Sequence, residues 1–348
     1  MSFRFNLLNL RTLLVLASVP WATARTQAPN WELLKVETTA SFRGLSVVSD
    51  KVIWASGTRG TVIRSVDGGT TWSVDSILDG ARFDLRGIHA TSDRVAHVAA
   101  TSGRIWKTTD GGKTWSLKLQ AADTSMFLDA IVFRNDREGF ALGDPMNGQF
   151  VILVTSDGGE TWREALGAAR PIANDGEAAF AASGTSLVLL GARFGWLGTG
   201  GATARVYRTV DGGATWRAHA SAIPAKAGSG GVFSVAFADS VHGVVVGGDY
   251  EQPDSSAGTA AMTVDGGVTW TPPLLFPRGY RSGVAMRRTD AGLLVAVAVG
   301  TTGSDITRDG GKNWVPLDGT PFNAVQFAPS GVAFAVGARG RIARMYVR

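Results

Sequence analysis

The sequence predicts an all-β fold, a seven-bladed β-propeller with four-stranded blades, and three observations support this class. A turn of the form Ser/Thr-x-Asp-Gly-Gly-x-Thr/Asn-Trp occurs six times. Its successive tryptophans are 43, 47, 54, 54 and 44 residues apart, which is the length of a propeller blade. The two ends of the chain supply parts of a seventh repeat. The aspartate and tryptophan of each turn are Asp67 and Trp72, Asp110 and Trp115, Asp157 and Trp162, Asp211 and Trp216, Asp265 and Trp270, and Asp309 and Trp314.

The first repeat divides into four short strands. Residues 42–50 (FRGLSVVSD) are expected to form the inner strand, and residues 51–57 (KVIWASG) the second. Residues 61–66 (TVIRSV) lead into the turn, and residues 71–77 (TWSVDSI) follow it as the outer strand. The next repeat has the same order, from LRGIHATSD to TWSLKLQ, so the pattern describes a recurring unit.

The seventh blade is predicted from both ends of the chain. The C-terminal stretch AFAVGARGRIARMYVR supplies its second and third strands but stops before an outer strand. NWELLKV, at residues 30–36, resembles an outer strand without its turn, and Trp31 precedes Trp72 by 41 residues. We therefore expect this N-terminal strand to complete the last blade, because an open ring would leave unpaired sheet edges.

The repeated turn is interpreted as structural. Its aspartate can accept hydrogen bonds from nearby backbone N–H groups, its glycines permit positive φ, and its tryptophan can bury a large ring between neighbouring sheets. A calcium loop is the alternative, but the repeat lacks further oxygen ligands at regular spacing. The four histidines have no metal-ligand spacing and no cofactor-binding motif is present, so neither a metal nor a cofactor is expected.

The N-terminus is predicted to be a signal peptide covering residues 1–24, followed by a single propeller domain over residues 25–348. Arg4 and Arg11 precede a short apolar run, and Ala22-Thr23-Ala24 has the form of a cleavage site. A membrane anchor is the alternative, although the apolar run is short for a span. The chain contains no cysteine, which excludes disulfides. These features predict a secreted or periplasmic protein without a transmembrane segment after signal removal.

The charge of the chain bears on its partners. The formal net charge is only +5, and no basic run is interleaved with aromatic residues, so nucleic acid is not expected as a partner. We expect a monomer that binds a protein segment or a glycan at the mouth of the central channel.

The candidate binding face surrounds one end of the channel. In a propeller, the connections into the inner strands share this end with the loops between second and third strands, opposite the repeated turns. The loops of the fourth and fifth blades are the longest of this second kind, which would explain both 54-residue intervals. The aligned inner strands place seven residues at the mouth: Arg43, Arg86, Asp129, Glu177, Phe233, Arg281 and Asn323. The loops add Asp144, Trp196, Asp249, Tyr250 and Arg339.

The charges of this face favour a ligand with an anionic group. Three arginines fall on one arc of the predicted ring, and Asp129 and Glu177 fall on the adjoining arc. Guanidinium groups bind carboxylates through paired hydrogen bonds, so a ligand that carries an anion beside polar groups would fit. The alternative is that these charges pair with one another across the rim and only make it rigid.

The turn resembles the Asp-box (BNR) repeat of sialidases and related propellers. This resemblance implies an alternative function, a glycoside hydrolase acting on an acidic glycan, with Glu177, Asp129 and Tyr280 as the catalytic candidates and three arginines on the substrate carboxylate. The chain departs from the sialidase pattern in two respects. It counts seven blades where sialidases have six, and the Phe/Tyr-Arg-Ile-Pro segment is replaced by SFRGL.

Residues 30–348 are more similar, as a whole, to the photosystem II stability/assembly factor family (the Ycf48-like propellers). The similarity lies in repeats such as GTRGTVIRSVDGGTTW. It implies an exported seven-bladed propeller, with arginines on one face, that acts as a non-catalytic platform for membrane-protein assembly. A binding or assembly platform without catalytic residues is therefore the expected function.

Overall fold

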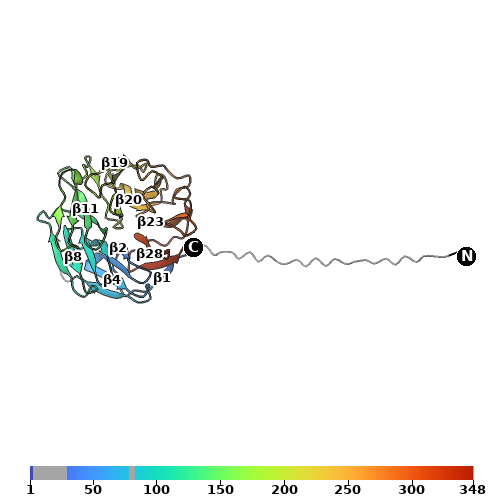
Figure 1. Ribbon diagram of the computed structural model, residues 1–348, viewed down its shortest axis with the longest axis horizontal. Helices are drawn as coiled ribbons and strands as arrows, with labels where there is room; N and C mark the ends of the chain where they lie inside the picture. Colours follow the sequence, from blue (N-terminus) through green and yellow to red (C-terminus); the bar gives the residue numbers. More distant parts are fainter. Residues whose placement is uncertain (3–29, 78–82, 348) are drawn as a thin grey trace.

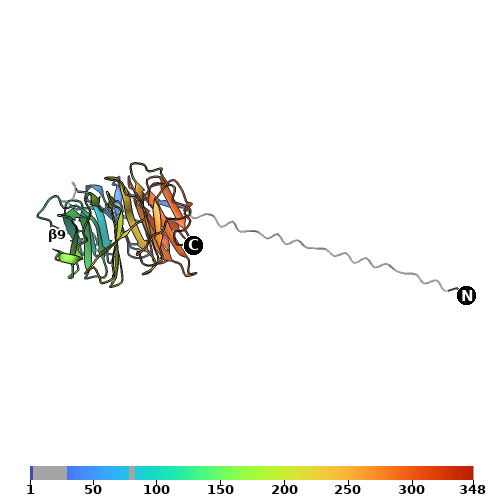
Figure 2. The same cartoon turned by 90° about the horizontal axis from the view of Figure 1, so that it is seen from above.

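The strands of the protein form seven sheets arranged in a ring around a central axis (Figures 1 and 2). The structure is a computed structural model that describes residues 1–2, 30–77 and 83–347. It confirms the predicted seven-bladed β-propeller. Apart from its first two residues, the predicted signal peptide lies outside the described residues.

The first three blades follow the repeat along the chain, each with four antiparallel strands from the axis outward. Blade 1 contains β2 (Phe42–Val47), β3 (Ile53–Gly57), β4 (Thr61–Ser65) and β5 (Ser73–Ser76). Blade 2 contains β6 (Leu85–Ala90), β7 (Ala96–Ala100), β8 (Arg104–Thr108) and β9 (Ser116–Gln120). Blade 3 contains β10 (Leu128–Phe133), β11 (Gly139–Met146), β12 (Gln149–Thr155) and β13 (Arg163–Glu164).

Blades 4 to 6 continue the ring. Blade 4 contains β15 (Leu187–Leu190), β16 (Phe194–Gly198), β18 (Arg205–Thr209) and β19 (Arg217–Ala220). Blade 5 contains β20 (Gly230–Phe237), β21 (Gly243–Asp249) and β22 (Ala260–Thr263), and a bridge from Met262 to Thr271 marks its outer strand. Two short strands, β14 (Glu177–Ala178) and β17 (Gly200–Gly201), extend this sheet beyond β20. Blade 6 contains β23 (Gly283–Arg288), β24 (Leu294–Gly300), β25 (Gly303–Thr307) and β26 (Val315–Pro316).

Blade 7 is built from both ends of the chain, as predicted. Its strands β27 (Ala324–Phe327), β28 (Val332–Val336) and β29 (Ile342–Tyr346) are joined by β1 (Glu32–Leu34), which pairs antiparallel with β29. The indole of Trp31 donates a hydrogen bond to the Ser304 hydroxyl at 2.8 Å and packs against Phe322, with the ring centroids 5.0 Å apart. The N-terminal strand therefore closes the ring by both backbone and side-chain contacts.

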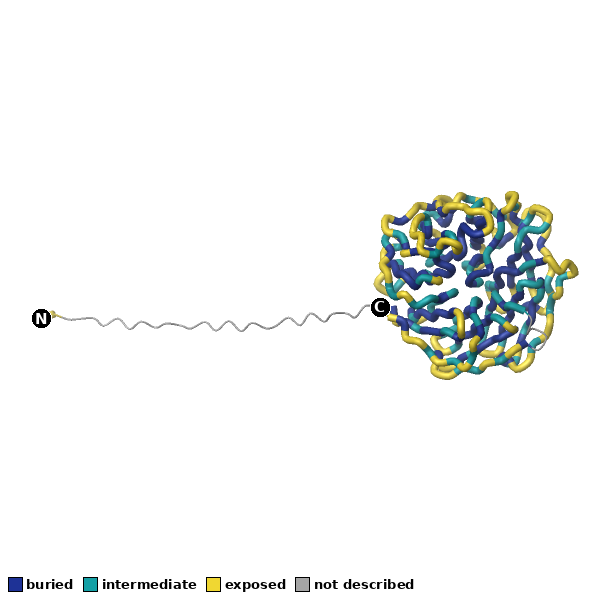
Figure 3. Tube along the Cα trace, turned by 180° about the vertical axis from the view of Figure 1, so that it is seen from behind, coloured by how far each residue is buried: buried dark blue, intermediate teal, exposed yellow. Residues whose placement is uncertain are grey.

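Apolar side chains from adjacent blades form a core at each of the seven blade interfaces. Figure 3 shows the buried residues within the blades and the exposed residues in the turns at the periphery. Each interface cluster contains or contacts one outer-strand tryptophan, and that ring packs toward the preceding blade. Trp31, Trp270 and Trp314 are buried, whereas the other four are half-buried. Burial of such large rings at every interface stabilises the ring as a unit.

The Asp-Gly-Gly turns hold their own backbone in a fixed shape. In the first turn, the Asp67 carboxylate accepts hydrogen bonds from the backbone N–H of Thr71 at 2.9 Å and from the Thr71 hydroxyl at 2.5 Å. These bonds lower the pKa of Asp67 to about 2. Gly68 and Gly69 have φ angles of 76° and 86°, a region that glycine enters without strain. The same carboxylate contacts recur in the other five turns.

The start of blade 4 differs from the sequence prediction. Its inner strand β15 begins at Leu187, ten residues after Glu177, and Glu177 pairs with Gly201 in the small extension of the next sheet. The extra length of this repeat lies in the connection between β13 and β15, and not in a loop between second and third strands. The run GEAAFAAS resembles an inner strand in sequence because its side chains are mostly small and apolar. In the structure this segment instead passes along the pocket at the channel mouth.

We expect Trp31→Ala to lower the free energy of unfolding by about 3–5 kcal/mol, the usual cost of truncating a buried tryptophan. The substitution removes both the contact with Phe322 and the hydrogen bond to Ser304. Leu33→Ala on the same strand is the matched control, because Leu33 is 63% exposed and its loss should change stability by less than about 0.5 kcal/mol. Chemical denaturation measures both, and equal losses would contradict the closure described here.

Candidate functional site

A pocket of about 540 Å³ occupies the channel mouth at the end opposite the Asp-Gly-Gly turns. Residues from six blades and from the connection between β13 and β15 line it. Eight of the side chains predicted from the sequence meet here: Arg43, Arg86, Asp129, Asp144, Phe233, Tyr250, Tyr280 and Asn323. Phe233, like Arg43, was placed at the mouth by the alignment of the inner strands.

A repeated backbone irregularity aims these side chains at the channel. The pairing of the inner strand with its neighbour shifts by one residue between Phe42 and Gly44, and at the matching place in blades 2, 3 and 5. A β-bulge leaves one residue unpaired and redirects its side chain. The residues within the four irregularities are Arg43, Arg86, Asp129 and Phe233. The bulge therefore converts a strand position into a position that faces the pocket.

Aromatic rings form one wall of the pocket. Phe233 lies at its centre, stacked on Phe180 with a centroid separation of 3.8 Å and in edge contact with Tyr280 at 4.8 Å. Tyr250 approaches Phe233 at 6.2 Å and donates a hydrogen bond from its hydroxyl to the carbonyl of Gly228. Burial raises the pKa of Tyr280, so its phenol stays protonated at neutral pH. This wall offers a contact surface for an apolar or aromatic group.

Arginines form the adjoining wall. The guanidinium of Arg43 makes no hydrogen bond or ion pair with any residue that the structure describes, and burial together with nearby Arg86 lowers its pKa. Arg86 is engaged, because it donates from Nε to Asp84 at 2.8 Å and from Nη1 to the carbonyl of Ala181 at 3.2 Å. Of the two, Arg43 is the cation available to an anionic ligand.

Two carboxyl groups occupy the corner beside Arg86. Asp129 is 0% exposed, and neither of its carboxyl oxygens has a hydrogen-bond partner among the described residues. Asp144, half-buried, accepts a hydrogen bond from the backbone N–H of Ala179 at 2.9 Å. Burial raises the pKa of both groups, and the charge of Asp144 raises that of Asp129 further. The corner therefore contains carboxyl oxygens that accept no hydrogen bond from the described residues.

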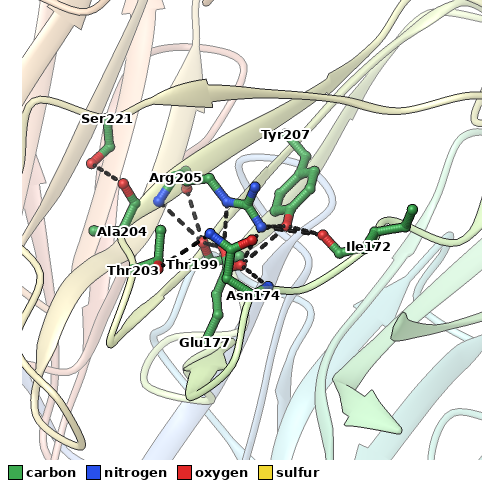
Figure 4. Close-up of polar contacts among 9 residues, drawn as sticks. All are labelled: Ile172, Asn174, Glu177, Thr199, Thr203, Ala204, Arg205, Tyr207 and Ser221. Atoms are coloured by element: carbon green, nitrogen blue, oxygen red, sulfur yellow. Dashed lines mark hydrogen bonds and ion pairs between the residues drawn. The ribbon is translucent and has the colours of Figure 1, made fainter. Parts of the chain in front are cut away.

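Residues 174–184, which we call the strap, carry the small and aromatic side chains that cover one side of the pocket. Glu177 fastens the strap to blade 4 (Figure 4). It is buried, forms an ion pair with Arg205, and accepts hydrogen bonds from the Thr199 hydroxyl at 2.5 Å and the backbone N–H of Asn174 at 2.9 Å. The Tyr207 hydroxyl donates to the carbonyl of Ile172 at 2.7 Å and lies 3.2 Å from the Glu177 carboxylate. Glu177 is thus a positioning residue outside the pocket, not a rim residue that contacts a ligand.

Arg281 is also withdrawn from the pocket. Its guanidinium and the Asp305 carboxylate are both fully buried and form an ion pair, with Nε donating at 2.7 Å. Nη1 donates to the carbonyl of Tyr280 and to the Thr302 hydroxyl, each at 2.8 Å. The predicted arc of three arginines is therefore reduced to Arg43 and Arg86, because the partner of Arg281 lies in its own blade.

The remaining predicted residues lie away from the pocket. Trp196 is buried in β16, where it stacks on Phe237 at 3.5 Å and donates to the carbonyl of Gly266 in an Asp-Gly-Gly turn. Asp249 forms an ion pair with Lys226, and Arg339 is exposed in the turn before β29. The sequence analysis placed Trp196 in a loop, whereas the structure has it inside strand β16.

The sequence did not point to two aromatic residues of the pocket, nor to the carboxylate that pairs with Arg86. Phe180 and Phe127 lie outside the aligned strand starts, and Asp84 was not recognised as the partner of Arg86. The spacing of Asp84 and Arg86 within DLRG was a usable signal, because side chains two residues apart on an extended strand point the same way. Phe180 gave no such signal, since the strap has no counterpart in the other repeats.

The arrangement is suited to binding. The described residues contain no group of three side chains that could hold a metal ion, and no helix among them is long and apolar enough to cross a membrane. Hydrolysis of the sialidase type would need Tyr280 close to Glu177. Arg205 holds Glu177 outside the pocket that Tyr280 lines, so this pair is not assembled.

We expect Asp129→Asn to raise the free energy of unfolding at pH 8, because the neutral amide removes the carboxylate charge that burial disfavours. The folded protein holds the Asp129 proton more tightly than the unfolded chain does. Stability is therefore greatest in acid and falls as pH rises from the ordinary aspartate pKa toward the raised one. Asn cannot titrate, so denaturation at pH 5 and pH 8 should show a smaller fall for the variant than for the wild type. Exposed Asp254→Asn is the control, and an equal fall in all three proteins would refute this account.

Comparisons with known proteins agree on the fold. No protein-family model matches the chain, and no curated protein sequence does. A solved structure described as YCF48 bound to D1 peptide is similar, with 17% identity, a TM-score of 0.65, and coverage of 92% of this chain and 100% of that one. YCF48 from Cyanidioschyzon merolae is 19% identical, with a TM-score of 0.59 and coverage of 91% and 99%. The GH74 enzyme of Niastella koreensis is 12% identical, with a TM-score of 0.51 and coverage of 85% and 62%.

Proposed function

We propose that the protein is a non-catalytic binding platform that takes a segment of another protein into the pocket at the channel mouth. The observation that carries this proposal is the pairing of an uncommitted arginine, Arg43, with an aromatic wall in one pocket. A carboxylate of the bound segment would contact the guanidinium, and a neighbouring apolar or aromatic side chain would contact Phe233 and Tyr250.

The dimensions and stiffness of the site support a short segment rather than a large interface. A volume of about 540 Å³ falls within the range of ligand pockets and holds a few side chains. The strap is fastened before any ligand arrives, by Glu177 on blade 4 and by the hydrogen bonds of Ala179 and Ala181 to Asp144 and Arg86. A preformed site loses less entropy on binding than one that must be ordered.

The comparisons support a protein partner over other ligands. YCF48 bound to D1 peptide is a propeller similar to this chain along nearly its whole length, and it binds a peptide. Because the identity is low, this likeness gives a precedent for the class of ligand and not for its sequence. Together with the predicted signal peptide, it leads us to propose an exported assembly or binding platform.

A glycoside hydrolase is the second candidate, and one observation favours it. Asp129 and Asp144 share a pocket wall, and burial raises the pKa of both, as a general acid requires. The similar fold of the Niastella koreensis GH74 enzyme is compatible with this reading. Release of reducing sugar from acidic polysaccharides, abolished by Asp129→Asn, would favour this candidate over the platform.

A random hexapeptide library displayed with free N-termini tests the platform. We expect the wild type to select peptides that carry a carboxylate beside an apolar or aromatic residue. Loss of a charge-assisted contact costs about 1.5–3 kcal/mol, so Arg43→Ala should weaken binding of the selected peptides roughly 10- to 100-fold. Titration calorimetry measures the change.

Arg94→Ala is the control, because it removes an arginine charge at the opposite end of the ring, where Arg94 is exposed. The carbonyl of Arg94 accepts a hydrogen bond from Gly111 in an Asp-Gly-Gly turn, far from the pocket. Its affinity should equal that of the wild type. A library that yields no binder, or binders that Arg43→Ala retains at full affinity, would count against the platform.

A further inference from the structure

We propose that Asp129 and Asp144 form a subsite for a primary ammonium group of the bound segment, supplied by a lysine side chain or by a free N-terminus. This inference rests on the proposed binding function and adds the chemistry of one contact to it. The inference is based on two aspartates that line the pocket. Three of their four carboxyl oxygens accept no hydrogen bond from the described residues.

The first step is the state of Asp129. Its side chain is fully buried and lines the pocket, yet neither oxygen accepts a hydrogen bond from any described residue. Buried polar side-chain atoms in folded proteins nearly always have a partner, so an exception calls for an explanation. The bulge in β10 explains the orientation, because Asp129 falls between Leu128 and Ala130, where the strand pairing shifts. Asp129 therefore lines the pocket with both carboxyl oxygens unpaired among the described residues.

The second step is the position of Asp144. Asp144 follows Gly143 on β11, the strand that pairs antiparallel with β10; it lines the same pocket as Asp129, and its charge acts on Asp129. The backbone N–H of Ala179 occupies Oδ1 of Asp144, and no described residue donates to Oδ2. The corner therefore offers three carboxylate oxygens without partners, two from Asp129 and one from Asp144.

The third step is that no cation of the protein fills the corner. Arg86 is the nearest cation that affects Asp129, and its guanidinium is engaged by Asp84 and by the carbonyl of Ala181. Arg86 donates to Asp84 and to the carbonyl of Ala181 and makes no hydrogen bond to Asp129. No described group donates to Asp129, and we assign this role to the bound segment.

The fourth step is the choice of an ammonium group. Its three N–H donors match the three free oxygens, and it is compact enough to reach a fully buried carboxyl at the end of a slim stem. A guanidinium is broader and planar, and it would meet Arg86 beside the corner. A metal ion is disfavoured because the described residues provide no third ligand there. From blade 1 to blade 3 the pocket thus presents Arg43, Arg86 and Asp129, two cations followed by an anion. This order of charges suits a segment that carries both an acidic and a basic group.

The experiment uses peptides selected from the library of free-N-terminus hexapeptides. Each is resynthesised in four forms: unmodified, acetylated at the N-terminus, acetylated at lysine, and acetylated at both. Acetylation removes the positive charge while leaving the rest of the segment intact. Affinities are measured by calorimetry for the full-length wild type, Asp129→Asn and Asp144→Asn.

We expect the doubly acetylated form to bind the wild type at least tenfold more weakly than the unmodified form. The singly acetylated forms identify whether lysine or the N-terminus enters the corner. The Asp129→Asn variant should bind all four peptide forms with the same affinity. That affinity should be close to the one with which the wild type binds the doubly acetylated peptide. Retained binding of that form shows that the variant is folded, and Asp144→Asn should give an intermediate preference.

The pH dependence provides a separate readout. The groups that surround Asp129 are Asp144, Arg86 and, beside Arg86, Asp84 and Arg43. An ammonium binds the ionised carboxyl, so the wild-type preference for the unmodified peptide should increase from pH 5.5 to pH 8 as Asp129 loses its proton. The preference should be independent of pH in Asp129→Asn.

Distinct results overturn the subsite and the platform. Equal binding of all four forms to the wild type would overturn the ammonium subsite while leaving the platform intact. A library without binders would remove both. An increase in melting temperature of the wild type, but not of Asp129→Asn, on addition of Ca²⁺ alone would assign the corner to a metal ion and overturn the inference.

Discussion

The pairing of β1 with β29 is the contact on which the rest of the structure depends. No blade supplies more than a few residues to the pocket at the channel mouth, so no single sheet contains a site. The ring brings the contributions together, and it is a ring only because the first strand of the chain completes the last sheet. Trp31 extends this closure into the apolar interface between blades 6 and 7. Loss of that interface would open an edge and separate the walls of the pocket.

The second constraint acts within the blades. A bulge at the start of an inner strand interrupts pairing for one residue and turns that residue toward the axis. Because the bulge recurs in four blades, chemically different side chains share one backbone geometry. The backbone pairing is therefore the same in these four blades, whereas the side chain at the unpaired position differs between them. Arg43, Asp129 and Phe233 give the pocket a cationic, an acidic and an aromatic sector from one structural device.

The sequence allowed the ring and most of the pocket to be predicted, and the failures have physical reasons. Repeats report backbone geometry, so the strands, the closure by Trp31 and the convergence of Arg43, Arg86 and Asp129 all followed from alignment. Alignment does not report burial or pairing, which is why Arg281 was assigned to the rim although Asp305 neutralises it in the interior. Glu177 was misplaced because the strap interrupts the repeat, and an insertion has no periodic signal by which to locate it.

The closure of the ring also orders events during synthesis. The strand that completes blade 7, β1, is made before every other strand of the ring, and its partner β29 is made after all of them. The N-terminal strand must remain unpaired, with Trp31 exposed, until about three hundred further residues have been added. Blades can fold one after another in the meantime, but the ring that forms the pocket cannot close before β29 has been made. A truncated nascent chain would therefore present an open sheet edge and no assembled site.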